Sequence, residues 1–214
     1  MRILVTLLLL TTAHVLQAQN HTFVFLNAKK DKAELPKEEV DKIMAGHMAN
    51  IQRLAKEGKL IAAGPFDGGG GIFIFNSTSI DQTREWLATD PGVQANRWNV
   101  EVFPFYIQAG SICAAKEPYE MVTYAFVRYV AQVTKFTAPT YPEIFKRHDD
   151  YIRELAKTGN VLLAGNFGQY EGGILIMKGD VQREVPENDP GVKELLMEFT
   201  QLKLWIAKGS FCEK

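Results

Sequence analysis

Two histidines and two aspartates have the residue types and the spacing that general acid–base chemistry needs. His47 and His148 each lie among apolar residues at helical spacing, and Asp90 and Asp189 each begin the sequence Asp-Pro-Gly-Val. An imidazole ionises near neutral pH and moves protons well when a carboxylate orients it. We therefore treat His47 with Asp90, and His148 with Asp189, as two candidate catalytic pairs.

Each pair also has a simpler explanation. A histidine on the apolar face of a helix is commonly a core residue that makes one hydrogen bond. Asp-Pro-Gly is typical of a turn, in which Asp caps, Pro fixes φ and Gly permits a positive φ. A functional role for the histidines is favoured because both were kept in two segments that have otherwise diverged. Both explanations stay open for the aspartates.

Those two segments belong to an internal repeat that organises the chain. Residues 47–66 align onto residues 148–167 without a gap, with nine of twenty positions identical. The Asp-Pro-Gly-Val sequence then returns in the same order, as does the sequence around Cys113, which reappears around Cys212. The repeat predicts two similar units, at residues 19–114 and 119–214.

Each unit is predicted to follow the order β-α-β-β-α-β of a ferredoxin-like fold. In the first unit we expect strands at about 22–26, 60–63, 72–75 and 100–107, with helices after Pro36 and at about 79–88. In the second unit Pro186 should degrade or remove the second helix. One such sheet leaves a face bare. We therefore expect an α+β pseudo-dimer, in which the two sheets pack face to face or close into an eight-stranded barrel with helices outside.

The first 18 residues have the pattern of a signal peptide, because Arg2 precedes an apolar run and small residues lead up to Ala18. The run is too short to span a bilayer, so we expect a secreted or periplasmic product with no membrane partner. A net charge of −1 and the lack of a basic run argue against a nucleic-acid partner. A small-molecule ligand or substrate is the expected partner, and further oligomerisation is left open.

Cys113 and Cys212 occupy equivalent places just after the last predicted strand of each unit. An exported chain with two cysteines commonly pairs them, but a bridge forms only if both lie near the pseudo-twofold axis. A disulfide and two free thiols are both open. The four glycines at 68–71 lack the Lys-Ser/Thr of a phosphate-binding loop and indicate a hairpin turn. No metal-ligand spacing and no haem motif is found, so we expect no metal and no cofactor.

The ordered motifs resemble the YCII-related family in both units. The motif residues are His47, Leu54, Gly58, Gly64-Pro65 and Asp90-Pro91, then His148, Leu155, Gly159, Gly165 and Asp189-Pro190. This resemblance implies a dimeric α+β barrel with a His–Asp catalytic dyad beside a pocket in each unit. One relative in that family is a dehydrochlorinase that acts on a chlorinated hydroquinone.

Carried over by position, the resemblance implies a lyase or isomerase that acts on a small aromatic or enolisable molecule, with His47 and Asp90 as the main dyad. The substrate would contact the residues of the Gly-Pro step and its counterpart, namely Gly64, Pro65, Phe66, Gly165 and Phe167. The alternative is a module of the same fold that binds a small ligand or a partner without catalysis.

The sequence departs from the family pattern at three places. Gly92 and Gly191 follow Asp-Pro where the family commonly has an aromatic residue, which should widen or reshape the pocket. Asn166 replaces the proline of the first unit's Gly-Pro step. With its shortened helix, the second unit is the one we expect to have lost activity.

Overall fold

The computed structural model describes residues 21–136, 140–180 and 182–212, so the predicted signal peptide lies outside the described residues. The first half contains β1 (His21–Ala28), α1 (Lys37–Lys56), β2 (Leu60–Pro65), β3 (Gly71–Phe75), α2 (Ile80–Leu87), α3 (Pro91–Gln94) and β4 (Trp98–Gly110). The second half contains β5 (Met121–Ala131), the 3-10 helix η1 (Val133–Lys135), α4 (Tyr141–Ala156), β6 (Val161–Asn166), β7 (Gly172–Met177), α5 (Glu184–Glu187), α6 (Pro190–Lys193) and β8 (Met197–Ala207). Each half therefore adds a short helix, which begins at the Asp-Pro step, to the predicted element order.

Local sequence signals account for where several helices end. Gly58 follows α1 with a φ of 68°, and Gly159 follows α4 with a φ of 80°, a conformation that glycine adopts without strain. The helix that contains Pro186, α5, has four residues, whereas its counterpart α2 has eight. The second helix of the second half is thus degraded to one turn rather than lost. In the described part of the chain, none of the helices has the length and apolar character needed to cross a membrane.

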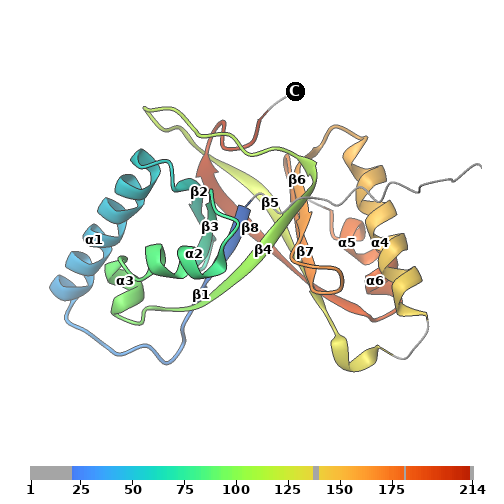
Figure 1. Cartoon of the computed structure of the whole chain (residues 1–214), viewed down its shortest axis with the longest axis horizontal. Coiled ribbons are helices and arrows are strands. Elements are labelled where there is room, and N and C mark those ends of the chain that lie inside the picture. The colour runs from blue at the N-terminus through green and yellow to red at the C-terminus, as the bar shows by residue number, and fades with distance from the viewer. Residues whose placement is uncertain (1–20, 137–139, 181, 213–214) are drawn as a thin grey trace, which may run out of the picture.

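The eight strands of the described residues form one antiparallel sheet, in the order β2-β3-β1-β4-β6-β7-β5-β8. The two halves join where β4 pairs with β6, with Tyr106 opposite Asn166. The sheet curves until its outer strands β2 and β8 approach each other, where Phe66 bridges to Leu204 (Figure 1). There the Asp67 N–H also donates to the Lys203 carbonyl at 3.0 Å. The fold is α+β, as the sequence predicts.

Side chains alternate between the two faces of this curved sheet. The inner face carries a core of aromatic and aliphatic residues, in which Phe23, Phe105 and Phe126 are completely buried. The outer face is covered by helices, with α1–α3 over the first half and α4–α6 over the second (Figure 1). A residue on the inner side of α1 or α4 therefore meets the outer face of the sheet and not the core within it.

A disulfide joins Cys113 to Cys212, with their Cα atoms 5.3 Å apart. Backbone hydrogen bonds flank it, from the Cys113 N–H to the Ser210 carbonyl at 2.9 Å and from the Cys212 N–H to the Ser111 carbonyl at 3.0 Å. Of the two alternatives left open by the sequence, the structure contains the disulfide. It ties the end of one half to the end of the other.

Candidate functional site

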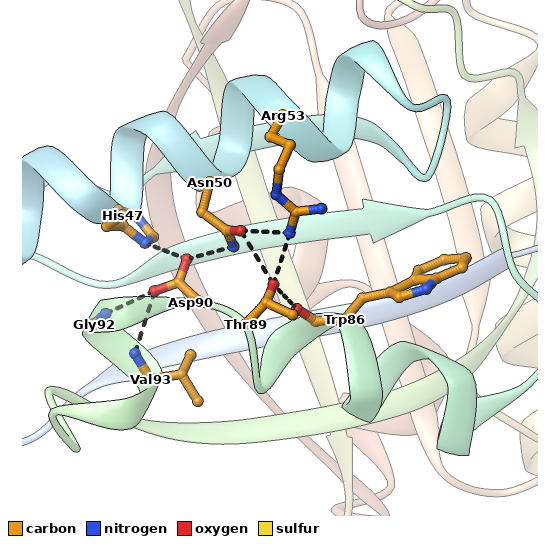
Figure 2. Close-up of polar contacts among 8 residues, drawn as sticks. All are labelled: His47, Asn50, Arg53, Trp86, Thr89, Asp90, Gly92 and Val93. Carbon is orange, nitrogen blue, oxygen red and sulfur yellow. Dashed lines mark hydrogen bonds and ion pairs between the residues drawn. The ribbon is translucent and has the colours of Figure 1, made fainter.

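His47 and Asp90 meet between α1 and the start of α3. His47 Nδ1 lies 2.8 Å from Asp90 Oδ2, and the side chains of the two residues are 8% and 1% exposed. Asp90 is held in place as the N-cap of α3, since its Oδ1 accepts hydrogen bonds from the backbone N–H groups of Gly92 and Val93 (Figure 2). One carboxylate therefore caps a helix and also holds the imidazole. Asp90 thus has both of the roles left open by the sequence, as a turn-capping residue and as the partner of His47.

Further polar side chains support this carboxylate. Asn50 Nδ2 donates to Asp90 Oδ2 at 3.3 Å, and Arg53 donates to Asn50 Oδ1 at 2.7 Å (Figure 2). Burial raises the pKa of Asp90, but the hydrogen bond and positive charge of His47, with the Val93 N–H and Asn50, outweigh burial and lower it. Asp90 is therefore held as a carboxylate, the form that orients an imidazole.

The lowered pKa of Asp90 predicts a loss of stability in acid. The folded-state pKa lies below the ordinary value of 3.8, so the carboxylate stabilises the fold above that pH, and the stabilisation is lost as the pH falls through the folded pKa. Urea unfolding of the wild type between pH 7 and pH 3 should show the free energy of unfolding falling below about pH 4. In the Asp90→Asn variant the free energy of unfolding should fall less steeply with decreasing pH. Equal slopes in the two proteins would show that the acid sensitivity does not come from Asp90.

The second half repeats the arrangement. His148 Nδ1 lies 2.7 Å from Asp189 Oδ2, with the two side chains 7% and 0% exposed. Asp189 is the N-cap of α6, and its Oδ1 accepts the Gly191 N–H at 2.8 Å. Tyr151 stands where Asn50 stands in the first half, and its hydroxyl donates to the Val185 carbonyl instead of to the aspartate. The structure thus brings the four predicted residues together as two separate pairs.

This geometry determines which imidazole nitrogen is available. A carboxylate at Nδ1 accepts a hydrogen bond, which fixes the proton on Nδ1 and leaves a lone pair on Nε2. Within the residues that the structure describes, neither His47 nor His148 has a hydrogen-bond partner at Nε2. Each Nε2 can therefore accept a proton, as a general base does.

The surroundings of the two imidazoles differ. The ring of Trp98 packs against that of His47 at a tilt of 43°, with ring centroids 4.7 Å apart, and the Phe73 ring stacks on His47 at 5.9 Å. In the second half Met197 takes the place of Trp98, and a cavity of about 10 Å³ adjoins His148. That volume is about what one water molecule needs. The cavity is lined by Phe145, His148, Asp149, Asn166, Gly168, Gln169, Gly172 and Met197.

The glycines that follow Asp-Pro do not widen the first site, contrary to the sequence expectation. A Cβ atom on Gly92 would lie 2.2 Å from the Trp98 ring, and one on Gly191 would lie 2.9 Å from Met197 Sδ. Glycine is needed at these positions because a large side chain from the following strand fills the space. An aromatic ring is thus present beside His47, but it comes from β4.

Replacing Gly92 by alanine should lower the free energy of unfolding by about 1–3 kcal/mol, because the new methyl group overlaps a rigid indole ring. Gly191→Ala is the matched control and should cost less, since the flexible Met197 side chain can move away. Chemical denaturation of both variants tests this. An equal loss of stability in the two variants would mean that the rigid Trp98 ring is not the cause of the cost at Gly92.

Four of the five residues expected to contact substrate have packing roles in the structure. A Cβ on Gly64 would lie 2.2 Å from the Trp205 carbonyl, and one on Gly165 would lie 2.6 Å from the Phe105 ring. Phe66 and Phe167 belong to the core on the inner face of the sheet, whereas the two histidines face its outer side. Pro65 ends β2 as an exposed residue. In the structure the two glycines allow close approach and the two phenylalanines fill the core, and a substrate contact for these five residues stays a prediction.

Sequence reasoning missed Tyr129, which packs edge to face against His148 with ring centroids 5.1 Å apart. Its hydroxyl is buried and has no hydrogen-bond partner among the residues that the structure describes. Burial, with the negative charge of Asp189, raises the pKa of Tyr129 well above 10.0, so the hydroxyl is neutral. A tyrosine in a β-rich segment was visible in the sequence, but only the strand register places it beside His148.

Tyr129→Phe is expected to raise the free energy of unfolding by about 1 kcal/mol, because it removes a buried unpaired hydroxyl without changing the ring. Tyr151→Phe is the control, and it should be destabilising because that hydroxyl donates to the Val185 carbonyl at 2.8 Å. Thermal and urea unfolding give the comparison. A loss in both variants would show that the Tyr129 hydroxyl has a partner, such as a bound water molecule.

The first of these two sites lies in a segment with known relatives. Residues 22–106 match the model of the YCII-related domain. This segment contains His47 and Asp90 and spans β1 to β4, whereas His148 and Asp189 lie beyond it. It makes up about two fifths of the chain. The sequence has no significant match among curated proteins.

Two solved structures resemble most of the chain at low sequence identity. One is a candidate monooxygenase from Fusobacterium nucleatum, with 13% identity and a TM-score of 0.46, covering 91% of this chain and 97% of that one. The other is the siroheme decarboxylase NirDL, with 7% identity and a TM-score of 0.42, covering 88% of this chain and 71% of that one. Across residues 21–136, 140–180 and 182–212, no group of three or more His, Cys, Asp or Glu side chains could hold a metal ion.

Proposed function

We propose that this chain is an exported general acid–base enzyme, a lyase or isomerase that acts on a small aromatic or enolisable molecule. The observation that carries the proposal is the hydrogen bonding of the two imidazole rings. Each is held at Nδ1 by a buried carboxylate and has no partner at Nε2 in the described part of the chain. That is the arrangement of an oriented general base.

In the proposed reaction, Nε2 takes a proton from an acidic carbon or hydroxyl of the substrate. The aspartate stays ionised and stabilises the imidazolium that forms. In an isomerisation the electron pair of the broken bond shifts within the substrate, and Nε2 returns the proton to another carbon. In an elimination the electron pair forms a new double bond, and a leaving group departs with the electrons of its own bond.

We also propose that the second half is a second YCII-like unit, so that the chain is a covalent pseudo-dimer. The support is threefold: nine of twenty aligned positions are identical, the strands and main helices follow the same order, and the His–Asp pair is repeated. Export is proposed from the leader pattern at residues 1–18, and a disulfide suits an oxidising compartment.

A specific observation favours a second candidate, a binding or interaction module without catalysis. Both aspartates cap short helices, and the imidazole side chains are only 8% and 7% exposed, so each pair also clamps a long helix to a short one. Trp98 further covers His47. A clamp of this kind would be kept for stability even if no proton is moved.

Turnover measurements separate the two candidates. A library of small phenols and enolisable ketones would be screened by thermal shift, and the compounds that bind would be tested for conversion by the wild type. Conversion that disappears in His47→Asn or His148→Asn, while the variant stays folded by circular dichroism, supports the enzyme. Compounds that bind but are never converted support the binding module. Undiminished conversion by the double variant would rule out both pairs as catalysts.

A further inference from the structure

We propose that the ligand approaches the second half of the chain, beside His148, where Asp149 and Asn166 contact it and select a small neutral or cationic molecule with a hydrogen-bond donor. This inference rests on the proposed function and names the substrate class of one of its two sites. It reverses the sequence expectation that the second half is the one to have lost activity.

The cavity beside His148 is the first observation. Its wall combines residues of α4 with the end of β6 and the loop that follows, so polar groups from separate elements converge on one imidazole. Asp149 follows His148 directly in α4, and its Oδ1 accepts a hydrogen bond from Gln108 of β4 at 2.6 Å. Among the described residues Asp149 makes no ion pair, so its negative charge is not neutralised locally.

The contrast with the first half is the second observation. In the gap-free alignment Met48 stands in the place of Asp149, and Pro65 in the place of Asn166. Neither offers a side-chain hydrogen bond, and Trp98 lies over His47 where Met197 leaves room beside His148. The cavity and the polar side chains of Asp149 and Asn166 thus occur together beside His148, whereas Met48 and Pro65 stand at the equivalent places in the first half.

These residues restrict what can bind. A carboxylate accepts hydrogen bonds and repels anions, so Asp149 favours a hydroxyl or an ammonium group and disfavours a carboxylate or phosphate. A cavity of about 10 Å³ takes one such group and not a whole ring. The rest of the ligand would therefore lie outside the cavity, near the exposed Gln169. Asn166 provides both a donor and an acceptor for the group that enters.

Nuclear magnetic resonance of the imidazole signals at pH 7.5 tests this with three probes: phenol, benzylammonium and benzoate. The His47 and His148 signals would be assigned with single His→Asn variants. We expect saturable shifts of the His148 signal with phenol and benzylammonium and none with benzoate at the same concentration. Asp149→Asn should weaken benzylammonium binding about tenfold, because the remaining amide oxygen carries no negative charge to attract the ammonium group.

Asp150→Asn is the matched control, since Asp150 is the next residue of α4 but pairs with Lys146. It should change benzylammonium binding less than about twofold. Larger shifts at His47, equal binding of benzoate, or equal effects of the two variants would overturn the inference. Probe binding at His148 without any turnover in the library screen would leave this inference standing and refute the proposed catalysis. Turnover that depends on His47 alone would support the proposed catalysis and refute the placement of the ligand beside His148.

Discussion

Replacing Asp90 by alanine is expected to lower the free energy of unfolding by about 3–5 kcal/mol, because several buried hydrogen-bond donors lose their acceptor at once. The change leaves four donors without their acceptor, namely His47 Nδ1, Asn50 Nδ2 and the backbone N–H groups of Gly92 and Val93. Asp90 is completely buried, so water cannot replace the lost oxygens without a structural change. Urea unfolding at pH 7 measures the loss.

Two controls locate the origin of that loss. Asp81→Ala removes a surface carboxylate that is 89% exposed and should change stability by less than about 0.5 kcal/mol. Asp189→Ala should fall between the two, because Asp189 accepts from His148 and the Gly191 N–H and has no neighbour equivalent to Asn50. If Asp90→Ala were as mild as Asp81→Ala, the buried pair would contribute nothing to the fold.

The second large effect is expected from the disulfide. The double variant Cys113→Ser with Cys212→Ser should unfold with a free energy about 3–5 kcal/mol lower than the wild type. The bridge closes a loop between residues 99 apart in sequence, which restricts the unfolded chain, and in the chain-entropy model the effect increases with loop length. Calorimetry and urea unfolding would both show the decrease.

A reducing agent provides the control for this variant. It should lower the melting temperature of the wild type toward that of the double variant, and it should leave the double variant unchanged. A wild type whose melting temperature does not respond, with two free thiols titrated after unreduced denaturation, would show that the cysteines are not paired in the isolated protein.

Much of the fold was accessible from the sequence because it depends on local chemistry. Gly58 and Gly159 mark helix ends since their positive φ values suit glycine, and Pro186 explains the one-turn helix α5. The mixed α+β architecture with an antiparallel sheet follows from the same patterns. The candidate pairs could also be selected in advance, because two copies of one spacing restrict which aspartate can meet which histidine.

The rest of the site depends on contacts between elements that are far apart in the chain. Trp98 lies over His47, and Tyr129 packs on His148, only because the strand register places them there. Gly64 and Gly165 resemble ligand-contact residues in sequence, but neighbouring strands and rings occupy the space above them. Residue spacing along the chain does not reveal which distant side chain fills a given space.

The covalent connection between the two halves has a consequence for how the two sites can change. In a symmetric dimer of identical chains, every mutation appears in both sites at once. Here each half has its own codons, so the residue beside the imidazole differs between the halves: Trp98 packs on His47, whereas Met197 lines the small cavity at His148. Substitutions near one His–Asp pair can therefore change that pair's surroundings while the other half stays as it is and serves as a scaffold.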